Sequence, residues 1–91
     1  METVNKVKFI NIKMEYLRDW LKIPQEYELG FMMIEPSFAM VFFNREGQKV
    51  VISARDISVY SKDILKDEFD FNKGFEVEVV HDWLRFEEVY D

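Results

Sequence analysis

Five residues that interrupt regular structure, three glycines and two prolines, divide the chain into short segments. They are Gly30, Gly47, Gly74, Pro24 and Pro36. Between them, apolar residues mostly alternate with polar ones, which is the period of a β-strand with one buried face. Short alternating segments joined by tight turns indicate an antiparallel sheet. The sequence therefore predicts the α+β class, with a small antiparallel sheet of four to six strands and one or two short helices.

The first four predicted strands cover residues 4–14, 28–34, 38–43 and 49–54. The third is apolar throughout, which is typical of a central strand with both faces covered. Residues 44–48 are predicted to form a hairpin loop between the third and fourth strands, where Gly47 is free to take a positive φ.

The first of these strands contains a change of phase. Val7 and Phe9 alternate on one side, whereas Ile10 and Ile12 alternate on the other. A bulge near Phe9 and Ile10, or burial of both faces, would account for this change.

Two short helical segments are expected. Residues 15–22 place Leu17, Trp20 and Leu21 on one side, and Pro24 ends this element because it disfavours helix at the preceding residue. A second helical turn is predicted over residues 61–65, with Ser61 as its cap. Since no linker or low-complexity tract interrupts the chain, residues 1–91 are predicted to form a single domain.

A second hairpin is predicted in the last third of the chain. Phe69 and Phe71 alternate with acidic residues, and so do Phe75, Val77 and Val79. The residues between them, 72–74, end in Gly74, which suits a three-residue loop with glycine in the left-handed conformation. This register would place Phe71 opposite Phe75.

Residues 12–28 also align without gaps on residues 75–91, with five identical positions among 17. Both segments suggest an alternating strand that leads into Asp-Trp-Leu followed by a basic residue. If the repeat is structural, Trp20 and Trp83 occupy equivalent, largely buried sites; the alternative is a chance match in a biased composition. If either ring is exposed instead, it is a candidate for an aromatic interface.

Aromatic side chains are unusually frequent, with nine Phe, four Tyr and two Trp in 91 residues. A domain of this size buries only about 60–65% of the surface of its unfolded chain. Part of the aromatic surface is therefore expected to face a partner, which can be a second copy of the same chain in a C2 homodimer. The alternative is a Phe-rich core with a few half-exposed rings.

Charge is unevenly distributed over the chain. The net charge is −6, and residues 56–91 carry four Lys or Arg against eleven Asp or Glu, a net −7. Such a chain is a poor direct ligand for nucleic acid, which demands phosphate neutralisation, but it suits a basic protein partner.

The sequence has no cysteine, no apolar run of membrane-spanning length and no signal-peptide pattern near Met1. We therefore expect no membrane association and a cytoplasmic location, in the protein's own cell or in an infected host.

The sequence shows no pattern typical of an enzyme. Its only histidine, His81, is followed by Asp82, but neighbouring residues on a strand point to opposite faces, so Asp82 is badly placed to orient it. No serine lies in a Gly-x-Ser-x-Gly sequence, and the three glycines are too far apart to form a phosphate-binding loop. We predict no enzymatic activity, no cofactor and no metal centre of the zinc type.

The candidate site lies on the predicted second hairpin. Its register would place Asp70 opposite Glu76 and Glu68 opposite Glu78, all on the face away from the aromatic residues. Like charges in direct opposition are unfavourable by about 0.2–1 kcal/mol per pair. Three things could offset this cost: a neighbouring strand that carries Lys6, Lys8 or Lys13, a bound Ca²⁺, or a basic partner.

The sequence therefore predicts a non-enzymatic protein-binding module that docks this acidic face on a basic site of a partner protein. One form of such a module is an inhibitor that occupies a polyanion-binding site, a device suited to small proteins of phages and other mobile elements. The alternative is a structural or assembly subunit that self-associates through its surplus aromatic surface.

Overall fold

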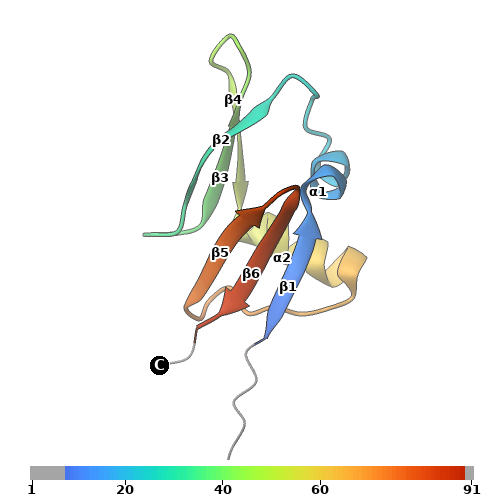
Figure 1. Ribbon diagram of the computed structural model, residues 1–91, viewed down its shortest axis with the longest axis vertical. Helices are drawn as coiled ribbons and strands as arrows, with labels where there is room; N and C mark the ends of the chain where they lie inside the picture. The colour runs from blue at the N-terminus through green and yellow to red at the C-terminus, as the bar shows by residue number, and fades with distance from the viewer. Residues whose placement is uncertain (1–7, 90–91) are drawn as a thin grey trace, which may run out of the picture.

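The computed structural model describes residues 8–89. Within this range it has six strands and two helices (Figure 1). The strands are β1 (Phe9–Lys13), β2 (Glu28–Met33), β3 (Ala39–Phe43), β4 (Lys49–Ser53), β5 (Phe75–Val80) and β6 (Trp83–Glu88). The helices are α1 (Met14–Leu21) and α2 (Ala54–Tyr60), and α2 continues as a π-helical turn over Ser61–Leu65. The predicted α+β class is confirmed. None of the helices among these residues is long and apolar enough to cross a membrane.

The six strands form two antiparallel sheets of three strands each. Sheet A has the order β1-β6-β5, and sheet B has the order β2-β3-β4. Sheet B is a meander of consecutive strands, and β3 is its central strand, as the apolar run over residues 38–43 predicts. The helices pack only on the inner side of β3, beside Met40 and Phe42, so the predicted covering of both faces is met on that side alone within residues 8–89. Sheet A instead joins distant segments, since Ile12 of β1 pairs with Leu84 of β6.

One hydrophobic core joins the inner faces of both sheets to the two helices. Its buried members are Ile10, Ile12, Leu17, Ile23, Phe38, Met40, Phe42, Ile52, Ile57, Tyr60, Phe69, Leu84 and Phe86. Around Phe86, the rings of four other phenylalanines lie with centroids 5.3–6.3 Å away, namely Phe38, Phe69, Phe71 and Phe75. This cluster accommodates much of the aromatic excess, but the side chains of Phe9, Tyr16, Phe31 and Trp83 remain exposed.

Helix α2 begins earlier than predicted, and its cap is Ser53 rather than Ser61. The Ser53 hydroxyl accepts a hydrogen bond from the Asp56 backbone N–H, and the Asp56 carboxylate accepts one from the Ser53 backbone N–H. This reciprocal capping box satisfies two backbone donors that a helix start would leave unpaired. Ser61 instead lies inside the helical segment, where it is buried and donates to the Asp67 carbonyl oxygen at 2.6 Å.

The predicted hairpin of residues 68–71 with 75–79 is wrong. Residues 68–71 form an irregular segment, and β5 pairs only with β6, through the two-residue turn at His81 and Asp82. Phe69 and Phe71 still point into the core, with ring centroids 6.3 and 5.4 Å from that of Phe75. Alternating aromatic residues therefore anchor a loop here, because ring packing in the core needs no ladder of backbone hydrogen bonds.

The repeat of residues 12–28 in residues 75–91 has no structural counterpart in the described chain. Trp20 lies near the end of α1, which stops at Lys22 in the left-handed conformation with φ 59°. Trp83 instead begins β6 after a tight turn. The shared Asp-Trp-Leu sequence takes the conformation that its surroundings require, and the two tryptophans occupy unrelated sites; the last two repeat positions, 90 and 91, lie outside the described residues.

Strand β1 pairs with β6 in a regular register from Phe9 to Lys13. The bulge considered near Phe9 and Ile10 is therefore absent from this pairing. The alternative, burial of both faces, does not hold either, because simple alternation turns Phe9 outward, where it is exposed, and Ile10 inward. Positions 4–7 of the predicted strand lie outside the described residues, and Met14 belongs to α1 rather than to the strand.

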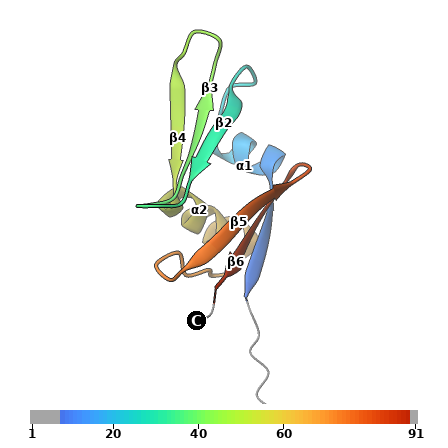
Figure 2. The ribbon, with the colours of Figure 1, turned by 60° about the vertical axis from the view of Figure 1, so that its left-hand side comes forward.

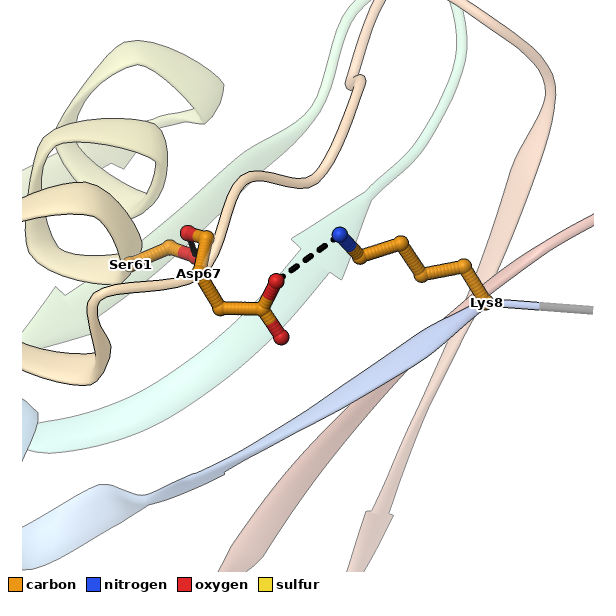
Figure 3. A network of polar contacts seen from close by, with 3 residues as sticks. All are labelled: Lys8, Ser61 and Asp67. Atoms are coloured by element: carbon orange, nitrogen blue, oxygen red, sulfur yellow. Dashed lines mark hydrogen bonds and ion pairs between the residues drawn. The ribbon is translucent and has the colours of Figure 1, made fainter.

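A polar network ties the loop after the π-helical turn to the residue before β1 (Figure 3). The Lys8 ammonium lies 2.8 Å from the Asp67 carboxylate, and the Asp67 carbonyl accepts the Ser61 hydroxyl. The hydrogen bond between the two charged groups is the main cause that raises the pKa of Lys8 and lowers the pKa of Asp67. The pair thus fastens this loop against sheet A.

Candidate functional site

The four carboxylates predicted to share one face are divided between two places. Glu76 and Glu78 lie on β5 and point to the outer side of sheet A, where they line a hollow with Arg85 and Glu87. Glu68 and Asp70 lie in the irregular segment before β5 and line a different hollow with Lys8 and Lys62. The predicted oppositions of Asp70 with Glu76 and of Glu68 with Glu78 are therefore wrong.

The outer face of sheet A is made of nine side chains, three from each strand, that alternate with the buried residues. The register places them in three rows across β1, β6 and β5: Phe9, Glu87 and Glu76; Asn11, Arg85 and Glu78; Lys13, Trp83 and Val80. Three carboxylates thus gather with two exposed aromatic rings on one side of a sheet whose other side is core.

Arg85 lies at the centre of this face and contacts two of its side chains, Glu87 and Phe9. Its guanidinium lies 3.3 Å from the Glu87 carboxylate and stacks 4.2 Å from the centroid of the Phe9 ring. In the sheet register Arg85 is also directly opposite Glu78, whereas Glu76 is directly opposite Glu87. The face therefore has one attractive and one repulsive cross-strand pair of charges.

Trp83 lines the opposite end of the same face. Its side chain is 44% exposed, although large aromatic side chains usually bury most of their surface. It borders a shallow hollow of about 360 Å³ with Asn11, Glu78, Val80, His81 and Arg85. An indole face beside a carboxylate is an arrangement that attracts a Lys or Arg side chain, through cation–π and ionic contacts.

Trp20, the other aromatic candidate, has a structural role. It is half-buried between the two helices, and its ring meets Tyr60 of α2 edge-on with centroids 5.4 Å apart. Of the two tryptophans, Trp83 is the one that offers a largely exposed ring to a partner.

The lysines proposed as internal partners of the four carboxylates have their closest contacts elsewhere, although the charge of Glu68 also helps to raise the pKa of Lys8. Lys8 pairs with Asp67, and Lys13 lies 3.8 Å from Glu15 and 5.2 Å from the Tyr16 ring centroid. Lys6 lies outside the described residues. Asp70 accepts the Asn72 backbone N–H at 2.9 Å, so its carboxylate closes the turn before β5.

The described residues offer little that resembles a catalytic centre. No group of three or more His, Asp or Glu among residues 8–89 could hold a metal ion, including the Ca²⁺ considered for the acidic residues. His81 is exposed at the tip of the β5–β6 hairpin, with φ 57°. The hydroxyls of Ser53 and Ser61 hold a helix cap and a loop, respectively.

Sequence reasoning missed the members of this face contributed by β1 and β6, namely Phe9, Arg85 and Glu87. These residues could be assigned to the face only if β6 were predicted as a strand. The two-residue turn before β6 is His-Asp, which is a weak sequence signal for a hairpin turn. The inward alternation of Leu84 and Phe86 is the signal that could have found them.

Comparison with known proteins gives no further guide. No protein-family model, curated protein sequence or solved structure matches this chain.

Proposed function

We propose that this protein is a non-enzymatic protein-binding module, and that the outer face of sheet A docks on a basic segment of a partner protein. The observation that carries this proposal is the exposed indole of Trp83 beside Glu78, on a face that also bears Glu76 and Glu87. Exposed aromatic rings are enriched at binding sites because they supply large contact area with little loss of rotamer freedom.

A basic side chain that enters the hollow at Trp83 gains two kinds of contact. Stacking on the indole contributes about 0.5–1 kcal/mol at an exposed site and about 2 kcal/mol once water is excluded. The carboxylate of Glu78 can accept a charge-assisted hydrogen bond from the same group. The net charge of −6 accelerates encounter with a positively charged partner.

A partner site that normally holds a polyanion would be blocked by this face, which makes the protein an inhibitor of that site. Competition distinguishes this form of the proposal from simple docking. Heparin, used as a generic polyanion, should displace the protein from its partner if the two occupy one site.

The experiment uses a Trp20→Phe variant, in which Trp83 is the single tryptophan, with excitation at a wavelength that tyrosine does not absorb, and titrates an unstructured Arg-rich peptide as the probe. We expect a change in Trp83 emission and a binding constant that weakens steeply as salt is added. Replacing the outer-face pair, Glu76→Gln with Glu78→Gln, should weaken binding about tenfold, which corresponds to about 1.4 kcal/mol.

The other two predicted carboxylates provide a matched control of equal charge. Glu68→Gln with Asp70→Asn removes the same two charges from outside the face and should leave binding nearly unchanged. Equal losses from both double variants would mean that only net charge matters and would overturn the proposed face. Binding of the peptide without any change in Trp83 emission would overturn it as well.

A further inference from the structure

Sheet B also has an outer face, and this face is apolar. The strand register places its side chains in three rows across β2, β3 and β4: Glu28, Phe43 and Lys49; Phe31, Val41 and Val51; Met33, Ala39 and Ser53. Phe31, Met33 and Val51 are 47%, 39% and 53% exposed. Six of the nine side chains are apolar, and they are contiguous.

The surface is shaped by a bulge in β2. The register with β3 shifts between Leu29 and Phe31, so Gly30 is the extra residue. The Phe43 ring lies over Gly30, only 2.6 Å from where a Cβ atom would be, and its centroid is 6.0 Å from that of Phe31. Glycine thus leaves room for the edge of the Phe43 ring, which extends the apolar surface next to Phe31.

Both helices lie on the other side of sheet B. Leu17 of α1 and Ile57 of α2 pack into the core with Met40, Phe42 and Ile52, the inner-face residues of this sheet. Figure 1 shows α1 to one side of sheet B, and Figure 2 shows the sheet from a direction in which both helices lie behind it. Within residues 8–89, no helix covers the outer face.

We propose that this face binds the same face of a second copy of the chain, forming a twofold symmetric dimer. The charges at its edges support a second copy as the occupant. Glu28 lies on β2 and Lys49 on β4, in the same row. A twofold axis parallel to β3 places each β2 over the other copy's β4, so each Glu28 faces a Lys49 of the other copy.

The overall charge of the protein strengthens this choice of face. Two copies, each with a net charge of −6, repel one another over most of their surfaces. The outer face of sheet B carries one acidic and one basic group and so has no net charge. It can therefore meet its own copy without apposed like charges, in the aligned packing at a spacing of about 10 Å that two sheets adopt.

The size of the face indicates that the dimer is reversible. Three strands about 4.8 Å apart and six residues of about 3.3 Å each give a flat footprint on the order of 300 Å² per copy. The two copies together thus contribute about 600 Å² of flat area, to which the rims and the relief of the side chains add. The total buried area stays at or below about 1,200 Å², the low end of specific interfaces. We therefore expect dissociation at low protein concentration.

The test is analytical ultracentrifugation of the full chain over about two decades of concentration, from about 5 to about 500 µM, because a small interface associates weakly. The wild type should shift with concentration from its mass of 11.1 kDa toward twice that mass. Val51→Lys, at an exposed strand position, should weaken association at least tenfold. Val80→Lys is the matched control, because Val80 is also an exposed strand valine, at 46% against 53% for Val51, and lies on the outer face of sheet A.

The charged edges test the symmetry itself. Glu28→Lys and Lys49→Glu should each weaken the dimer, and the double variant should restore it, while thermal melts verify that each variant is folded. A monomer at every concentration would overturn the proposal, and so would equal weakening by Val80→Lys and Val51→Lys. Failure of the double exchange to restore association would refute the axis along β3.

Discussion

Sheets A and B have the same construction but opposite outer faces. Each has three antiparallel strands, and each packs its inner side chains into the shared core. The outer face of sheet A carries three glutamates, an arginine and a lysine around Trp83, whereas that of sheet B carries one charge pair at its edges and an apolar centre.

This difference shows that the inward and the outward residues of a strand have different roles. Apart from Glu88 at the end of β6, the inward residues of both sheets are apolar and serve one core. The outward residues differ, and the two proposals rest on this difference: a basic segment as the partner of sheet A, and a second copy of the chain as the partner of the face of sheet B, whose net charge is zero. The proposed docking and dimer faces are therefore independent of one another.

The largest effects should come from the core that the two sheets share. Phe42 of sheet B and Phe86 of sheet A are both fully buried. Phe42→Ala and Phe86→Ala should each lower the free energy of unfolding by about 3–5 kcal/mol, through lost burial and the cavity left behind. Amide hydrogen exchange should show that β3 and β6 lose protection together in both variants. If Phe42→Ala opened only β3, the sheets would be two separate cooperative units.

A smaller effect should distinguish two glycines from different sheets, Gly30 inside β2 and Gly74 before β5. In Gly30→Ala the new methyl group would collide with the Phe43 ring in sheet B, so we expect a loss of about 1–3 kcal/mol in the free energy of unfolding. Gly74→Ala, before β5 of sheet A, meets nothing within 4 Å and should be nearly neutral. Urea denaturation of both variants measures the contrast. A neutral Gly30→Ala would show that the ring moves aside without cost.

Two charge changes on sheet A should have still smaller effects on the free energy of unfolding, and the two effects should be opposite in sign. Glu76→Lys turns the repulsion with Glu87 into attraction and should raise the free energy of unfolding by about 0.2–1 kcal/mol. Glu78→Lys places like charges opposite Arg85 and should lower it by a similar amount. Urea melts at low and moderate salt should show both effects shrinking, because these groups are exposed. Changes of the same sign would contradict the register of β5 with β6.

The smallest effect concerns the Lys8–Asp67 pair beside sheet A. Folding lowers the pKa of Asp67 below its ordinary value of 3.8, so the pair stabilises the fold fully at pH values above 3.8. This stabilisation is lost as the pH falls through the folded-state pKa. The stability difference between wild type and Asp67→Asn should therefore be constant near neutral pH and shrink below pH 3.8. Thermal melts against pH measure it, with Asp63→Asn as the control. A difference that persists at the lowest pH would show that the carboxylate charge is not its cause.

Sheet B could be predicted almost fully from the sequence, because its strands follow one another and Gly47, at φ 82°, forms the turn of one hairpin. Sheet A could not, since local pattern does not determine which distant strands pair. The alternation at Phe69 and Phe71 indicated a strand. Both side chains pack into the core, but such packing does not require their backbone to pair with another strand. The Ser53–Asp56 capping box was a local signal for α2 that the helix prediction did not use.

For the candidate site, the outward direction of Glu76 and Glu78 followed from the alternation of β5. Their neighbours Arg85 and Glu87 did not, because they come from β6, whose first residues Trp83 and Leu84 follow Asp82 and so repeat the Asp-Trp-Leu sequence at the end of α1. The position of Trp83 depends on the same pairing, so its exposure was beyond the reach of sequence alone.

The pairing of β1 with β6 also sets the order in which the protein can be completed during synthesis. Sheet B needs only residues 28–53, so its meander can close early, since short loops cost little entropy. Strand β1 must wait for a partner about 70 residues downstream, which takes a ribosome roughly 4–14 s at about 5–20 residues per second. During that interval Ile10 and Ile12 have no β6 to cover them. This part of the core is therefore completed only after the last strand has been synthesised.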